Sequence, residues 1–178
     1  MKLRARLIVL SLIATMVFSF VGLQGVSAQS DLSEEQLKRI SSNCLSIKNS
    51  LNQLHASDAL LRVNRGQLYD SIGSKLMNNF NSRLSSNNLD NKGLQATTNG
   101  YQTALTTFRN DYQLYERQLT ATIRIDCDKS PAEFHNAIED ARVKRAKVHT
   151  DVLRLNLYID DYRTGVNDFL INFERIAD

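Results

Sequence analysis

The sequence predicts an all-α protein: an elongated antiparallel three-helix bundle or coiled coil, in up-down-up order, that follows an N-terminal signal peptide. Apolar residues recur at alternating steps of three and four residues in three long segments. This spacing keeps one seam of each helix against its neighbours over many turns. The composition, with 1 Pro, no Trp and 7 Gly among 178 residues, is also typical of helices. Clusters of turn-forming residues separate the segments.

Residues 1–28 have the order of a secretory signal peptide. Three basic residues precede an apolar run over residues 7–23, and small residues at positions 26–28 form a cleavage site. We expect cleavage before Gln29, because Ser and Thr interrupt the apolar run. A single helical domain over residues 29–178 would remain. The alternative is an uncleaved membrane anchor, since roughly 17 apolar residues can span a bilayer.

Removal of the leader changes the charge of the chain. Of the 22 Lys and Arg, three lie in the leader, whereas all 19 Asp and Glu follow it, so 19 basic and 19 acidic residues remain. A nucleic-acid-binding protein needs a basic footprint, and we therefore expect no nucleic-acid partner. The basic cluster over residues 142–147 has acidic neighbours on both sides, which favours a solvated helix face.

The first helix is predicted over about residues 33–85. Ser33 and Gln36 have the spacing of a capping box, which marks a helix start. Its predicted seam contains Leu37, Ile40, Cys44, Ile47, Leu51, Leu54, Asp58, Leu61, Arg65, Leu68 and Ile72. The apolar spacing then changes to steps of four, and Gly66 and Gly73 lie nearby. We expect a bend or break between residues 64 and 75.

Residues 85–93, rich in Ser, Asn, Asp and Gly, predict a turn before the second helix, residues 94–126. The second seam contains Leu94, Thr98, Tyr101, Leu105, Phe108, Tyr112, Tyr115, Leu119 and Thr122. Pro131, directly after a capping Ser, predicts the start of the third helix, residues 131–177. The third seam runs at heptad spacing from Phe134 to Ile176, and Arg145 is its one charged member.

Cys44 and Cys127 are predicted to form a disulfide. Two cysteines in an exported chain favour a bridge. If the second helix runs back antiparallel to the first, residues equally far from the turn lie level with each other. The midpoint of the two cysteines falls between residues 85 and 86, at the edge of the predicted turn. The alternative is two buried free thiols. A redox-active pair is not expected, because the two cysteines are far apart in the sequence and do not form a Cys-X-X-Cys motif.

The same register predicts a polar contact between helices. First-helix residue x lies level with second-helix residue 171 − x, and second-helix residue y lies level with about 259 − y of the third helix. Asp58 and Arg145, which each interrupt an apolar seam, come to one level. We predict an interior ion pair between them, with the Tyr112 hydroxyl as a third partner, because an unpaired charge in a core is costly. The alternative is that both side chains reach solvent at the edge of the seam.

No residues are predicted to be catalytic or to bind a cofactor or a metal. His55, His135 and His149 stand apart from one another and from the cysteines, so metal-ligand spacing is absent. The sequence has no phosphate loop, nucleophile elbow or dinucleotide motif. We therefore expect that the protein is not an enzyme.

These observations favour an exported, non-enzymatic helical adaptor or structural protein of the bacterial cell envelope or surface. It would work outside the cytoplasm, in the periplasm, on the surface or in the medium, and bind an unknown protein or envelope component. In gross architecture the chain resembles small exported helical proteins of bacterial envelopes, although no motif carries that resemblance. The alternatives are a periplasmic holdase-type chaperone and a membrane-anchored coiled-coil protein with an uncleaved leader. We expect a monomer, and a dimer is the alternative.

Overall fold

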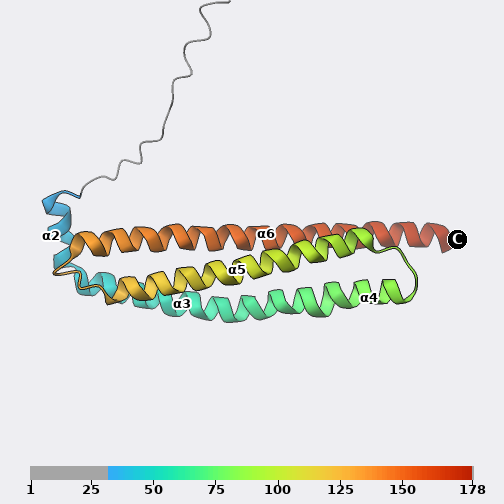
Figure 1. Cartoon of the computed structure of the whole chain (residues 1–178), viewed down its shortest axis with the longest axis horizontal. Coiled ribbons are helices and arrows are strands. Elements are labelled where there is room, and N and C mark those ends of the chain that lie inside the picture. The colour runs from blue at the N-terminus through green and yellow to red at the C-terminus, as the bar shows by residue number, and fades with distance from the viewer. Residues whose placement is uncertain (1–31, 178) are drawn as a thin grey trace, which may run out of the picture. The chain divides into compact units, whose positions relative to one another are not determined.

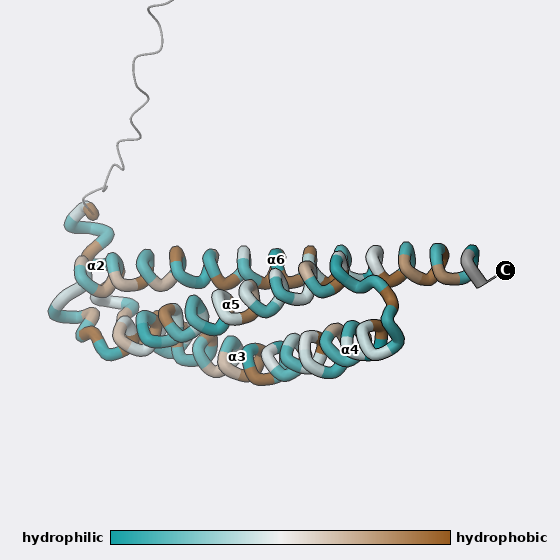
Figure 2. Tube along the Cα trace, turned by 45° about the vertical axis from the view of Figure 1, so that its right-hand side comes forward, coloured by the Kyte–Doolittle hydropathy of each residue, from teal (hydrophilic) through white to brown (hydrophobic). Residues whose placement is uncertain are grey.

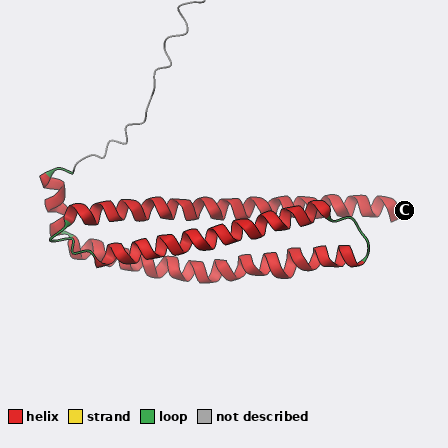
Figure 3. Cartoon of the chain, viewed as in Figure 1, coloured by secondary structure: helices red, strands yellow, loops and turns green. Residues whose placement is uncertain are grey.

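The computed structural model describes residues 32–177, with side chains described as far as Arg175, and its regular elements are all helical (Figures 1 and 3). The all-α prediction is confirmed. The predicted signal peptide, residues 1–28, lies outside the described residues, and so does the side chain of Ile176. The elements are α2 (Glu34–Ser42), α3 (Cys44–Ser71), the π-helix η1 (Ile72–Met77), α4 (Asn78–Ser86), α5 (Lys92–Arg124) and α6 (Pro131–Ala177).

The first helix, predicted over about residues 33–85 with a bend or break between 64 and 75, is already interrupted at Asn43. The start is as expected: Ser33 and Gln36 form the capping box, with the Gln36 N–H 3.3 Å from Ser33 Oγ. At Asn43, however, the side-chain amide donates to the Arg39 carbonyl at 2.8 Å and competes with the helical pattern. The short α2 therefore turns away from the axis of α3 and packs against α6 (Figure 1).

From Cys44 to Ser86 the chain remains helical, but η1 is a π-helix. The bend expected at residues 64–75 overlaps this segment only in part. Gly73 permits the close approach of η1 and α5, because a Cβ at this position would lie 2.5 Å from Gln102 Nε2. Gly66 has open space around it and no such role.

The turn after α4 is short and contains Asn88 in a left-handed conformation, with φ of 57°. Asn tolerates this conformation better than most residues do. The second connection separates Arg124 from Pro131, and Pro131 is the first residue of α6. Pro suits that position because its fixed φ matches a helix and its missing N–H needs no partner.

The α3–η1–α4 rod, α5 and α6 run side by side, and α5 packs along much of α6 (Figure 1). Figure 2 shows hydrophobic residues along the side of α6 that faces the other helices. All nine residues of the predicted α5 seam are buried. In α3, by contrast, only Asp58 and Tyr69 are buried. The core therefore centres on α5, and α3 is covered on one side only.

Buried tyrosines bind the α3–η1–α4 rod to the other two helices near η1. The Tyr101 hydroxyl of α5 donates to the Tyr69 carbonyl at 2.7 Å, and the Tyr162 hydroxyl of α6 lies 2.9 Å from Asn81 Oδ1. Burial raises the pKa of Tyr162 to about 12. Both hydroxyls therefore stay protonated at neutral pH and act as donors.

Candidate functional site

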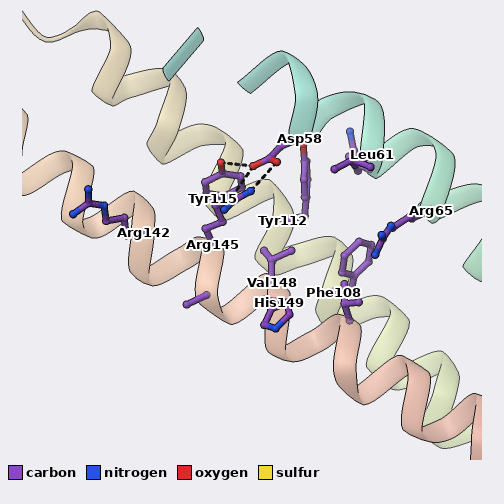
Figure 4. A pocket seen from close by; sticks show the side chains of 13 residues that line it. Asp58, Leu61, Arg65, Phe108, Tyr112, Tyr115, Arg142, Arg145, Val148 and His149 are labelled. Carbon is purple, nitrogen blue, oxygen red and sulfur yellow. Dashed lines mark hydrogen bonds and ion pairs between the residues drawn. The ribbon is translucent and has the colours of Figure 1, made fainter. Parts of the chain in front are cut away.

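An open cleft of about 480 Å³ lies between α3 and α6, with α5 beneath it (Figure 4). Apolar and aromatic side chains from all three helices line its inner part: Leu61, Phe108, Tyr112, Val148 and Val152. Four arginines, Arg62, Arg65, Arg142 and Arg145, surround them together with His149. Asp58 is the one acidic residue of the lining. The cleft therefore combines an apolar interior with a basic rim.

Asp58 and Arg145 form a two-point ion pair at one end of this cleft (Figure 4). Arg145 Nε donates to Asp58 Oδ2 at 2.8 Å, and Arg145 Nη2 donates to Oδ1 at 3.1 Å. The Asp58 side chain is 11% exposed and that of Arg145 is 51% exposed. The interior pair that the sequence predicts thus has one buried and one half-exposed partner. Its arginine lies at the edge of the seam.

The third partner is Tyr115, so the assignment to Tyr112 is wrong. The Tyr115 hydroxyl donates to Asp58 Oδ2 at 2.7 Å. The Tyr112 ring instead lies under Arg62, whose Cζ is 5.0 Å from the ring centroid, within reach of a cation–π interaction. Tyr112 and Tyr115 are three residues apart on one helix face. A register counted from turns locates a contact only to within about one helical turn.

The surroundings of Asp58 favour its charged form. Burial alone would raise the pKa of this carboxyl, but the hydrogen bonds from Arg145 and Tyr115 outweigh it, and the net pKa is lowered. The pKa of Tyr115 is raised, by burial and by its hydrogen bond to Asp58. Asp58 is therefore an anion whose charge is already neutralised by Arg145. It has no free proton for acid–base chemistry.

A second polar cluster, which the sequence analysis missed, joins α5 to α6. Asp111 and Asp151 are both buried, and Lys147 Nζ lies 3.0 Å from Asp111 Oδ1. The Oδ2 atoms of the two aspartates are buried without a donor. Burial and the neighbouring Asp111 raise the pKa of Asp151. The surroundings of Asp151 therefore favour its protonated form.

Cys44 and Cys127 lie at disulfide distance, with Cα atoms 5.5 Å apart. The pair joins the start of α3 to the connection between α5 and α6. Next to it, the Ser41 hydroxyl donates to the Asp128 carbonyl at 3.2 Å. A cysteine pair of this kind is consistent with an oxidising, extracytoplasmic compartment.

The outer face of α6 carries large apolar side chains that are exposed to solvent. We call Val143, Thr150, Leu153 and Leu157 the outer stripe; their spacing of seven, three and four residues places them on one face. Val143 is 70% exposed and Leu157 is 63% exposed. Between residues 141 and 159 the chain has five Lys or Arg, and its one acidic residue, Asp151, points inward and is buried. Arg142, Arg145 and Lys147 form ion pairs, so Lys144 and Arg154 are the basic residues of this segment that remain unpaired among the described residues.

The described part of the chain holds no group of three or more His, Cys, Asp and Glu that could bind a metal ion. Within residues 32–177, no helix is both long enough and apolar enough to cross a membrane. Comparison with known proteins gives no match to a family model, a curated protein or a solved structure. A functional assignment therefore has to start from the surfaces described above.

Proposed function

We propose that the protein is an exported, non-enzymatic helical adaptor or structural protein of the bacterial cell envelope or surface that binds another macromolecule. The observation that supports this proposal is the outer stripe. Large exposed apolar residues at regular helical spacing are typical of surfaces that receive a partner helix. Because Arg154 is adjacent to Leu153 and forms no ion pair among the described residues, the best-suited partner is an amphipathic helix whose apolar face has acidic neighbours.

The proposal includes the architecture and the location of the protein. In this view the chain is an antiparallel three-helix bundle in up-down-up order, and the Asp58–Arg145 pair holds α3 to α6. The leader directs export and is cleaved, after which Cys44 and Cys127 are oxidised. A nucleic acid is a poor partner, because the mature chain carries no net charge. A membrane becomes a partner only if the leader stays attached.

Site-specific photo-crosslinking in intact cells tests the proposal. A crosslinking amino acid at Leu153 or Leu157 should capture one and the same partner, whereas the same amino acid at Arg83, exposed on α4, should not. Arg154→Glu should reduce capture from position 157, because it reverses a charge beside the stripe. Equal capture from all three positions would reject the outer stripe as the docking surface.

A holdase-type chaperone is the second candidate, and one observation favours it. Beyond the outer stripe, α3 exposes further large apolar side chains, among them Leu45, Leu60, Val63 and Leu68. Such scattered sites suit many unfolded clients better than one helix. The two functions separate in one assay: a holdase suppresses the aggregation of a reduced, unfolding client protein, whereas an adaptor with one specific partner does not.

A further inference from the structure

We propose that the cleft between α3 and α6 binds a free anionic amphiphile: a molecule with one negatively charged head group and a single apolar tail, such as a fatty acid. The cleft volume of about 480 Å³ falls within the range of about 300–1,000 Å³ of small-molecule sites. This site lies apart from the outer stripe. The proposal can therefore hold or fail independently of the adaptor function.

The basic rim supplies the site for the head group. Arg145 is paired with Asp58, and Arg142 is paired with Glu139. Within the described residues, Arg62 and Arg65 form no ion pair, and both are exposed at the cleft. The rim therefore keeps an excess of positive charge in a mature chain that has none overall. A guanidinium group binds a carboxylate through two parallel hydrogen bonds.

The interior of the cleft supplies the site for the tail. Leu61 lines the cleft and is 47% exposed, and Phe108 and Tyr112 form an aromatic floor. An apolar tail would cover these side chains. The Asp58–Arg145 pair joins α3 to α6 at one end of the cleft (Figure 4). Because this pair crosses the path of a continuous polypeptide, a tail that ends inside the cleft fits better than a peptide that passes through it.

Isothermal titration calorimetry with decanoate, below its micelle concentration, tests the proposal on the mature full-length protein. We expect saturable binding of one decanoate per chain that weakens as salt is added, because an exposed head-group contact is screened. Decyl maltoside has the same tail and a neutral head, and acetate has the head without the tail. Both should bind at least about tenfold more weakly, since each lacks one half of the recognition.

Two matched pairs of variants locate the site. Arg65→Gln should weaken decanoate binding about tenfold, the loss expected for one charge-assisted hydrogen bond. Arg83→Gln, an exposed arginine outside the cleft, should leave it unchanged. Leu61→Ser should also weaken binding, whereas Leu60→Ser, its neighbour outside the cleft and 63% exposed, should not. All four residues are exposed, and a thermal melt by circular dichroism verifies that each variant folds.

Three results would overturn the proposal. The first is no heat of binding with millimolar decanoate, and the second is equal binding of decanoate and decyl maltoside. The third is equal affinity in the two members of either variant pair. Binding to vesicles of anionic phospholipid in the absence of decanoate binding would assign the basic rim to a membrane surface instead. Decyl phosphate distinguishes the head groups: equal affinity shows that the negative charge, rather than the carboxylate, is recognised.

Discussion

Among the polar residues, we expect substitution of Asp58 to lower the free energy of unfolding the most. Asp58→Ala removes three hydrogen bonds and leaves the buried Tyr115 hydroxyl without its acceptor. We expect a loss of about 1–3 kcal/mol in the free energy of unfolding, measured by urea denaturation. Tyr115→Phe should also destabilise, whereas Tyr112→Phe should not, because the Tyr112 ring makes its contact with Arg62 through its face.

Stability after Asp58→Ala that stays within about 0.5 kcal/mol of the wild type would show that the pair behaves as a surface contact. The pH dependence gives a second test. The folded pKa of Asp58 is lowered. Its contribution is therefore present at neutral pH and is lost as the pH falls below the ordinary Asp value of about 3.9, through the folded pKa.

Asp151 should have the opposite pH dependence. Its pKa is raised, mainly by burial and then by Asp111, while Arg154 and Lys147 counteract this shift in part. The folded state therefore binds the proton more tightly than the unfolded state does, and stability decreases as the pH rises through the folded pKa. Asp151→Asn should abolish this decrease and stabilise the protein at pH 7 by on the order of 1 kcal/mol, because the amide can donate to Asp111.

Thermal melts of the wild type and Asp151→Asn between pH 4 and pH 8 measure the difference. A variant that melts below the wild type across this range would contradict a raised pKa of Asp151 in the folded state. Asn110→Asp, an exposed position next to Asp111, serves as a control for a general change of charge.

From the sequence, contacts between side chains of different helices could be predicted only to within about one helical turn, which is the accuracy of the helix register. The helix register counted from the two turns brings Asp58 and Arg145 to one level, and the structure places them in contact. The same rule puts Asp111 level with residue 148, between Lys147 and Asp151, so the second cluster was within reach of the sequence. Neither Asp111 nor Asp151 interrupts a predicted seam, which is why the pattern gave no signal for them.

Among the elements, α5 followed its sequence pattern and the α3–η1–α4 rod did not. A helix between two neighbours buries a whole apolar seam, as α5 does. α3 is covered on one side only, so three of the eight predicted seam residues in α3 stay exposed: Leu61, Arg65 and Leu68. The buried positions of the rod after Asp58 are instead Tyr69, Gly73, Met77, Asn81 and Leu84. The spacing of apolar residues alone cannot reveal the π-helix η1, which shifts the buried face of the rod, because a π-turn depends on tertiary contacts.

We expect the cysteine pair to stabilise the packing of the helices more than any other single contact between them. Cys44 and Cys127 are 83 residues apart, and closing a loop of this length stabilises a protein by about 4 kcal/mol in the chain-entropy model. We expect that reduction lowers the melting temperature and that oxidised mature protein has no titratable thiol under denaturing conditions. The double variant Cys44→Ser/Cys127→Ser should melt like the reduced protein. Two free thiols per chain in protein isolated from its native compartment would contradict the bridge.

At the scale of the whole molecule, the prediction of a monomer depends on whether the other helices cover the apolar stripe that shifts around the first helix. In the sequence, the change to steps of four makes an apolar stripe from Leu68 to Leu84 shift around the first helix, and this stripe is the surface that would pair with a second copy in a dimer. Phe80 and Leu84 now pack inside the protein, and only Leu68 and Leu76 of that stripe remain exposed. Two leucines bury far less area than a stable dimer requires. Light scattering on the mature protein should give the monomer mass, and a dimer that persists at nanomolar concentration would contradict it.

The six-residue π-helix η1 marks the place where the α3–η1–α4 rod can lose one residue without disturbing the helices on either side. A π-turn accommodates one residue more than an α-turn does, so η1 behaves as a tolerated insertion in an otherwise α-helical rod. Deletion of the exposed Ser74 should convert η1 to an ordinary helix and keep both flanks in phase. Deletion of the exposed Ser57, inside regular α3, would rotate Cys44 by about 100° away from Cys127. We expect natural variants of this rod to gain or lose a residue at η1, and a deletion of Ser57 that still forms the bridge would contradict this view.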